Sequence, residues 1–147
     1  MTQALTSLDR ALIGWECERL IHHYAMLNDA GQFHEMAALF AENGAFARPT
    51  DADNLIVGRQ AILAMYLSRP PRFTRHMITS VVITAQDADH AAGHSYLSLH
   101  TAQAEATPPA QADLSYLIGA FHDRFVREGG VWKFLERRGS LSLRVGG

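Results

Sequence analysis

The segment that decides the fold is residues 114–144, LSYLIGAFHDRFVREGGVWKFLERRGSLSLR. It holds two long runs in which apolar and polar residues alternate, Leu114 to Arg127 and Val131 to Arg144, with Gly129-Gly130 between them. Alternation with a period of two is typical of a half-buried strand, and a glycine pair between two such runs favours a tight hairpin. The segment therefore predicts two long antiparallel strands.

Two further strand-like runs precede this hairpin, at His76 to Ala85 and at Ala91 to Thr101. The polar residues 86–89 between them predict a turn, and Pro108-Pro109 marks a longer loop before the hairpin. Four consecutive strands with short connections favour an antiparallel sheet.

The N-terminal part of the chain has the period of an amphipathic helix. Apolar residues from Leu8 to Ala30 recur every three or four positions, Thr6 and Asp9 have the spacing of a capping box, and Gly31 suits a left-handed C-cap. We expect its buried face to hold Ile13, Cys17 (as an inert thiol), Leu20, Tyr24 and Leu27.

Two shorter helices are predicted, one from Phe33 past Phe40 to the turn pair Asn43-Gly44, and one over Gly58 to Ser68. A short strand, Ala45 to Arg48, lies between them. Helices followed by strands predict an α+β domain, with a curved antiparallel or mixed sheet wrapped around three N-terminal helices. A sheet curled in this way forms a cone whose mouth suits a small molecule.

Composition narrows the class of protein. The 147 residues are 48% hydrophobic with a formal net charge of -2, so we expect one folded domain over residues 1–147 and no nucleic-acid partner. A single cysteine excludes a disulfide framework. Without an apolar run of the ~20 residues that a membrane span needs, and without a secretory signal pattern, a cytoplasmic location and no membrane partner are expected.

The outer face of the curled sheet is expected to mediate self-association. Apolar residues on four long strands cannot all face the helices, so one set is left exposed, and such patches mark interfaces. We expect a homodimer, with a trimer as the other possibility. The residues expected to form the patch are Met77, Val81, Ile83, Leu97 and Leu99, or their neighbours of opposite parity.

Asp29 and His76 are the first candidates for acid–base chemistry. Asp29 lies in the last turn of the first helix, where a carboxylate is disfavoured by the helix dipole, and it is either solvated there or held at a pocket mouth. His76 opens a strand and shares a face with Ile78, Ser80 and Val82. It is either a structural group or a general base whose second ring nitrogen is oriented by a carboxylate.

Other polar residues are candidates for substrate binding. Tyr24, Tyr96 and His100 could line the pocket, and Arg137 and Arg138 face opposite sides of one strand, so that one of them could contact an anion inside the cone. The histidines show none of the usual metal-binding spacings, and no phosphate-binding or nucleophile motif occurs. We therefore expect neither a metal nor a cofactor.

Several motifs in their order resemble the SnoaL-like polyketide cyclase and dehydratase family. They are YAMLNDAGQF at 24–33, ALFAENGAF at 38–46, GRQAI at 58–62, RHMITS at 75–80 and DRFVREGGVWKF at 123–134. The resemblance covers nearly the whole chain. It implies the nuclear-transport-factor-2-like fold, a cone-shaped, cystatin-like α+β roll.

The resemblance also implies catalytic roles. Dehydratases and dehydrochlorinases of this superfamily use an Asp–His dyad, whose positions correspond here to Asp29 and His76. Asn28 and Arg48 stand where scytalone dehydratase has tyrosines, and His100 corresponds only approximately to its second pocket histidine. All three are candidate substrate-binding residues, and the departures argue against the substrate of that enzyme.

The leading hypothesis is a cofactor-independent lyase or isomerase acting on a small, mostly apolar cyclic, aromatic or polyketide-like molecule. His76, oriented by Asp29, would remove a proton from carbon, and Arg137, Arg138 or a pocket tyrosine would stabilise the developing oxyanion. Two alternatives are a non-catalytic ligand-binding domain and a structural subunit like the small subunits of ring-hydroxylating dioxygenases, because one fold supports many functions.

Overall fold

The computed structural model describes residues 3–147. Its elements are α1 (Ser7–Asp29), α2 (Phe33–Ala37), β1 (Phe40–Ala47), the 3-10 turn η1 (Pro49–Asp51), β2 (Ile56–Val57), α3 (Arg59–Ser68), β3 (Phe73–Asp87), β4 (His90–Ala102), β5 (Tyr116–Glu128) and β6 (Val131–Val145). None of the helices in this part of the chain combines the length and the apolar character that crossing a membrane requires.

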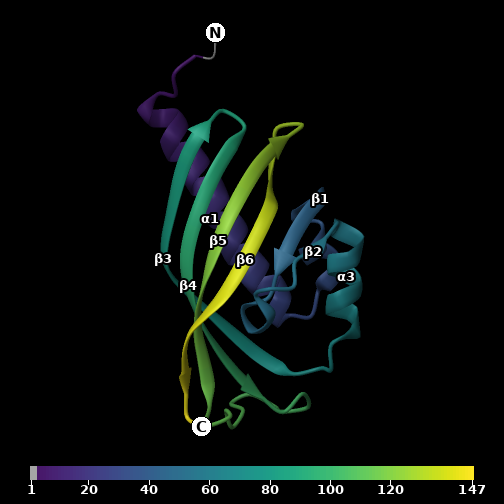
Figure 1. Cartoon of the computed structure of the whole chain (residues 1–147). Coiled ribbons are helices and arrows are strands. Elements are labelled where there is room, and N and C mark those ends of the chain that lie inside the picture. Colours follow the sequence, from purple (N-terminus) through teal and green to yellow (C-terminus); the bar gives the residue numbers. More distant parts are fainter. Residues whose placement is uncertain (1–2) are drawn as a thin grey trace.

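The strands form one mixed sheet in the order β2-β1-β6-β5-β4-β3. β1 runs parallel to β6, and every other neighbouring pair is antiparallel. The long strands β3 to β6 twist together, α1 crosses behind them, and α3 lies beside β1 and β2 (Figure 1). The predicted α+β class, with three helices packed in a curved sheet, is confirmed.

Helix α1 has the capping and the buried face that the sequence predicts. Thr6 and Asp9 exchange both bonds of the capping box, at 2.8 and 3.0 Å. The helix ends at Asp29, and Gly31 follows with φ +70°, a conformation that favours glycine. Cys17 is fully buried, and burial raises the pKa of its thiol to about 12. The predicted face is buried at Ile13, Leu20, Tyr24 and Leu27.

The prediction for residues 33–44 is wrong at its second half. α2 already ends at Ala37, and β1 begins at Phe40 and runs through Asn43-Gly44. Gly44 lies at an irregularity in the β1–β6 pairing between Phe40 and Ala45, and the backbone leaves no room for a side chain there: an added Cβ would come within 2.9 Å of Ala41 O and 3.1 Å of Phe134 O. This glycine serves close packing of β1 on β6 rather than a turn.

A backbone irregularity in β3 changes which residues face the core. Ser80 has φ 53°, and the pairing of β3 with β4 shifts register between Thr79 and Val82. Beyond this point the inward parity is reversed, so Val81 packs against the core and Val82 is 61% exposed. The predicted shared face of His76 and Val82 is therefore wrong, although Ile78 does share it.

The structure corrects the first of the two predicted sets for the outer patch, and the inversion accounts for Val81 and Ile83 of that set. Ile83, Leu97 and Leu99 belong to or pack against the core, as Val81 does, and Met77 is the only member of that predicted set with a large exposed fraction among the described residues. The large exposed apolar residues of β3 and β4 are Met77, Val82 and Tyr96. Val82 and Tyr96 belong to the opposite-parity set that the prediction also allowed.

Candidate active site

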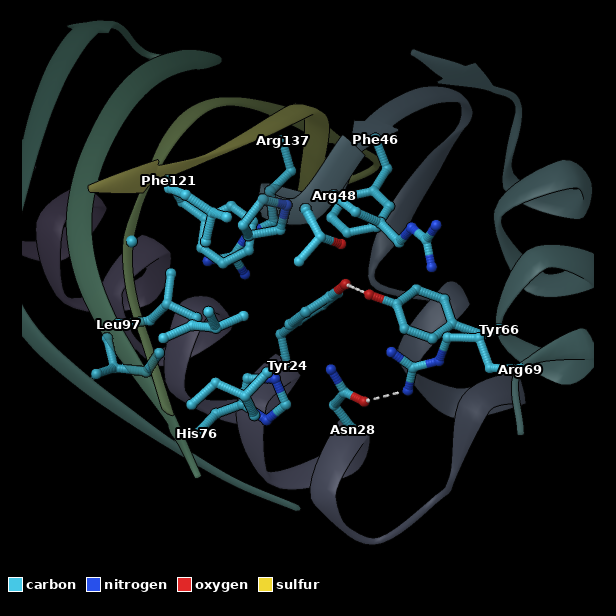
Figure 2. A pocket seen from close by; sticks show the side chains of 17 residues that line it. Tyr24, Asn28, Phe46, Arg48, Tyr66, Arg69, His76, Leu97, Phe121 and Arg137 are labelled. Atoms are coloured by element: carbon cyan, nitrogen blue, oxygen red, sulfur yellow. Dashed lines mark hydrogen bonds between the residues drawn. The ribbon is translucent and has the colours of Figure 1, made fainter. Parts of the chain in front are cut away.

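A cavity lies between α1 and the inner face of the sheet, with about 680 Å³ of space outside the protein atoms, part of it open to solvent. Figure 2 shows that its labelled side chains converge from helices and strands on one space. Its apolar walls include Phe46, Ile78, Leu97, Leu99, Leu117, Phe121 and Leu141. Its polar lining consists of Tyr24, Asn28, Arg48, Thr50, Tyr66, Arg69, His76 and Arg137. An apolar cavity with a few convergent polar groups is typical of a small-molecule site.

A second, wider hollow adjoins the cavity at its mouth. The two spaces share the lining residues Asn28, Arg48, Arg69 and Leu99. Asp29 borders only the outer hollow, whereas His76 borders only the inner cavity. The pair therefore spans the boundary between them.

Asp29 and His76 are directly hydrogen-bonded. His76 Nδ1 lies 2.6 Å from Asp29 Oδ1, and each side chain is only 12% exposed. The backbone N–H of His76 donates to Asp29 Oδ2 at 2.9 Å, and the Thr74 hydroxyl donates to Oδ1 at 2.8 Å. These bonds fix the carboxylate at the end of α1 against the start of β3. With Nδ1 held, the other ring nitrogen of His76 is the one left for the cavity.

The charge of Asp29 is stabilised in place. Burial alone raises the pKa of its carboxyl group, but the hydrogen bonds from His76 and Thr74 outweigh burial and hold the pKa below its usual value. Asp29 is therefore a carboxylate at neutral pH, and a carboxylate can only accept hydrogen bonds. It consequently favours the tautomer of His76 that carries its proton on Nδ1.

Arg137 reaches the cavity from the centre of β6. It is only 1% exposed, and its guanidinium carbon lies 3.8 Å from the ring centroid of Phe121 and 4.5 Å from that of Tyr24. Its Nε lies 3.3 Å from the buried carboxylate of Asp123. In residues 3–147 the guanidinium nitrogens have no hydrogen-bond partner. Donors without acceptors at the wall of a cavity can bind an oxygen atom of a ligand.

Asp123 supplies the opposite charge to Arg137. Burial raises the pKa of Asp123 to about 6, although the charge of Arg137 acts in the other direction. At neutral pH the carboxyl group is therefore ionised, and the buried pair has no net charge.

Two tyrosine hydroxyls meet beside this arginine. Tyr24 on α1 and Tyr66 on α3 are hydrogen-bonded to each other, and both are buried (Figure 2). Burial raises the pKa of both phenols, so they are neutral at physiological pH. One hydroxyl donates to the other, and the second proton remains available for a ligand.

The mouth of the cavity is formed by arginines from two loops. Arg69, at the end of α3, donates to Asn28 Oδ1 at 3.3 Å and lies over the ring of Tyr66, 4.6 Å from its centroid. Arg48 follows β1, and the next residue, Pro49, packs on Gly139 of β6, where an added Cβ would lie 2.5 Å from Pro49 Cδ. This contact fixes the segment that carries Arg48.

Five of the predicted substrate-binding and catalytic residues line the cavity, and Asp29 contacts one of them. Those that line it are Tyr24, Asn28, Arg48, His76 and Arg137. Tyr96, His100 and Arg138 do not line it, which corrects their predicted place. Because Leu97, Leu99 and Arg137 point inward, their strand neighbours point outward.

The outward side chains have partners of their own. Tyr96 is 46% exposed, and His100 stacks on Tyr116 at 4.6 Å between ring centroids. Arg138 bonds Glu136. No group of three or more His, Cys, Asp or Glu side chains within residues 3–147 is placed to hold a metal ion.

Three site residues were not singled out from the sequence. In the sequence, Tyr66 has the spacing of an ordinary residue on the apolar face of a helix. Arg69 lies in the segment before Pro70 that ends the helix. Asp123 carries a usable signal: it alternates with Phe121 and Phe125 on the inner face of β5, so a carboxylate at that position must be buried.

Solved structures of similar shape include enzymes. A provisionally assigned scytalone dehydratase from Novosphingobium aromaticivorans DSM 12444 has a TM-score of 0.80 at 20% identity, over 95% of this chain and 91% of that one. A hexachlorocyclohexane dehydrochlorinase, LinA type 2, has a TM-score of 0.79 at 17% identity, over 95% and 92%. At these identities the likeness shows the fold alone.

A third similar structure contains a ligand. A Catenulispora acidiphila protein in complex with S-DNPA has a TM-score of 0.71 at 21% identity, over 90% of this chain and 95% of that one. The shared fold is the nuclear-transport-factor-2-like, cystatin-like roll. Comparison with curated proteins finds no significant match. The family described as the SnoaL-like domain matches residues 9–138. Since this match spans most of the chain, the protein belongs to the SnoaL-like domain family.

Proposed function

We propose that the protein is a lyase or isomerase that acts on a small, mostly apolar cyclic molecule and uses His76 as a general base. The observation that carries this proposal is the 2.6 Å hydrogen bond between His76 Nδ1 and Asp29 Oδ1, made by a histidine that lines the cavity. A base needs one ring nitrogen free and correctly oriented, and a carboxylate on the other nitrogen provides that orientation.

The first step is the removal of a proton from carbon. The free ring nitrogen, Nε2, takes a proton from a carbon next to a carbonyl group, and the C–H electron pair moves into an enolate. The negative charge that develops on the carbonyl oxygen is met by Arg137 and by the free hydroxyl proton of the Tyr24–Tyr66 pair. Asp29 stabilises the imidazolium that forms.

The enolate can react further in two ways. In an elimination, the electron pair forms a C=C bond, the bond to a leaving group on the neighbouring carbon breaks, and the proton on His76 protonates that group. In an isomerisation, the substrate carries a C=C bond conjugated with the enolate, and His76 returns the proton to the far carbon of that system, so that the C=C bond changes position. Relatives named as a dehydratase and a dehydrochlorinase support the elimination, and the S-DNPA complex supports a small organic ligand.

The proposal is tested by proton exchange, which requires no knowledge of the natural substrate. Ring ketones such as 2-tetralone are first screened for binding by NMR chemical-shift changes. For those that bind, loss of the α-proton signal in D₂O is followed with the wild-type protein and with His76→Gln. We expect exchange that depends on His76. Binding without enzyme-dependent exchange for every ligand would instead support the non-catalytic, ligand-binding alternative.

A further inference from the structure

We infer that Arg48 and Arg69 form a cationic rim that binds an anionic group of the ligand, of the carboxylate class, at the mouth of the cavity. Calling this ligand the substrate rests on the proposed function, whereas the binding of the anion does not. The inference narrows the expected ligand from an apolar ring to an apolar ring that carries an acid group.

The two arginines stand where a bound ligand would leave the apolar cavity. Both line the inner cavity and the outer hollow. Figure 2 shows them on the same side of the cavity as Tyr66, one on each side of that ring. Their charges reach the Tyr66 hydroxyl, because both act to lower the pKa of this phenol against the larger effect of burial.

Neither guanidinium of the rim is hydrogen-bonded to a carboxylate. Arg69 bonds the neutral amide of Asn28, and its guanidinium otherwise lies over aromatic rings. Arg48 forms a loose, partly exposed ion pair with Asp51, in which Nη2 and Oδ2 are 3.9 Å apart, beyond hydrogen-bond distance. Within residues 3–147 no carboxylate oxygen accepts a hydrogen bond from either guanidinium, and Asp29 is already occupied by His76 and Thr74.

The arginine deeper in the cavity differs in this respect. Arg137 has Asp123 beside it, so that pair has no net charge at neutral pH. The rim therefore offers two guanidinium groups whose N–H donors are not taken up by a carboxylate. Guanidinium groups suit carboxylates because their planar N–H donors match the two carboxylate oxygens.

The rim would orient a bound ligand along the cavity. A carboxylate held at the rim leaves the attached ring pointing inward, between the leucines of β4 and β5 and beside His76. The rim would then both select acids and set which end of the ligand enters first.

The test compares benzoate with benzamide, which have nearly the same shape but differ in charge. Dissociation constants are measured by NMR titration for the wild type, for Arg48→Gln/Arg69→Gln, and for Arg75→Gln. Arg75 provides the matched control, because it removes the same charge from the exposed, outer face of β3. We expect the wild type to bind benzoate at least about tenfold more tightly than benzamide, as for one charge-assisted contact.

In the double variant this preference should fall to within about twofold, while Arg75→Gln should keep it. High salt should weaken benzoate binding and leave benzamide binding unchanged. Equal affinities in the wild type, no benzoate binding at millimolar concentration, or a preference that survives in a folded double variant would each overturn the inference. Far-UV circular dichroism and retained benzamide binding establish that the double variant is folded.

The outcome is separable from that of the proposed function. His76→Gln should keep the preference for benzoate. If the wild type prefers benzoate but catalyses no proton exchange, the rim stands and the proposed function fails. If the protein exchanges ketone protons but does not prefer benzoate to benzamide, the proposed function stands and the inference of an anion-binding rim fails.

Discussion

Replacing Asp29 with asparagine should change the tautomer of His76 while the fold is kept. The amide has one oxygen and one NH₂ group where the carboxylate has two acceptors. The backbone N–H of His76, 2.9 Å from Asp29 Oδ2, can only donate, so the amide oxygen must face it. The NH₂ group then faces His76 Nδ1 and the Thr74 hydroxyl, where Oδ1 was.

Both of those partners can adapt, and the adaptation removes the base. The Thr74 hydroxyl rotates to accept, and His76 moves its proton to Nε2 so that Nδ1 can accept. The nitrogen left for the cavity is then protonated and cannot take a proton from a substrate. We expect a rate loss of about 10²–10⁴, the usual contribution of general-base catalysis.

The cost in stability should be modest. Three hydrogen bonds to a charged group become bonds between neutral groups, each weaker by roughly 1 kcal/mol, so unfolding should become easier by about 1–3 kcal/mol.

Three measurements check this prediction: α-proton exchange, denaturant unfolding, and ¹⁵N chemical shifts of the His76 ring. Asp87→Asn is the matched control, because Asp87 contacts His90 Nδ1 at 2.9 Å on the exposed end of the same strand. It should leave exchange unchanged. Ring shifts in Asp29→Asn that still report a proton on Nδ1, or exchange within a fewfold of the wild-type rate, would refute the reasoning. A His76→Ala variant should lose a similar factor, and the double variant little more, since the two residues act as one unit.

Other outcomes follow from the same structure. Folding lowers the pKa of Asp29, so its contribution to stability is complete above the ordinary aspartate pKa of 3.8 and is lost as pH falls through the lower pKa of the folded state. Asp29→Asn should therefore flatten the pH dependence of the free energy of unfolding in that acidic range. Leu20→Ala should cost about 2–5 kcal/mol in denaturant unfolding, whereas Leu12→Ala, at a position 53% exposed, should cost less than about 0.5. Asp123→Asn should destabilise the fold by about 3–5 kcal/mol because Arg137 loses its buried counter-charge, and a thermal shift of under a degree would contradict this. Sedimentation equilibrium should give a species heavier than the 16.2 kDa monomer, and a single monomeric species at micromolar concentration would count against self-association.

Periodicity in the sequence was sufficient for the long elements. The helical period of residues 8–30 and the alternation in residues 114–144 correspond to α1, β5 and β6 within a few residues. It failed where one residue altered the pattern. The positive φ of Ser80 is compatible with serine but not predicted by it, and it reverses which side of β3 faces inward.

Asn43-Gly44 shows the opposite problem. The pair is typical of a turn, but here it lies at an irregularity of the pairing between β1 and β6, where the backbone approaches Gly44 closely. Such crowding is a tertiary effect that no local pattern contains.

The site could be predicted as far as it depends on strand parity and family resemblance. Arg137 and Arg138 must face opposite sides, and the inward one is identified only once its aromatic neighbours are placed. Tyr24 and Tyr66 lie on different helices and are 42 residues apart in sequence. Helical periodicity predicts which side of each helix is buried, but not which residues of two helices meet.

The packing of Pro49 on Gly139 has a consequence for how ligand preference can change among related proteins. Under the two proposals, proton transfer is assigned to residues of α1 and β3, and the choice of ligand is assigned in part to the connection that carries Arg48. Pro49 of that connection packs on Gly139 of β6. Residues 50–55 beyond the attachment are mostly exposed. If both proposals hold, substitutions in this segment that keep Pro49 and Gly139 should change which ligand binds without altering Asp29 or His76.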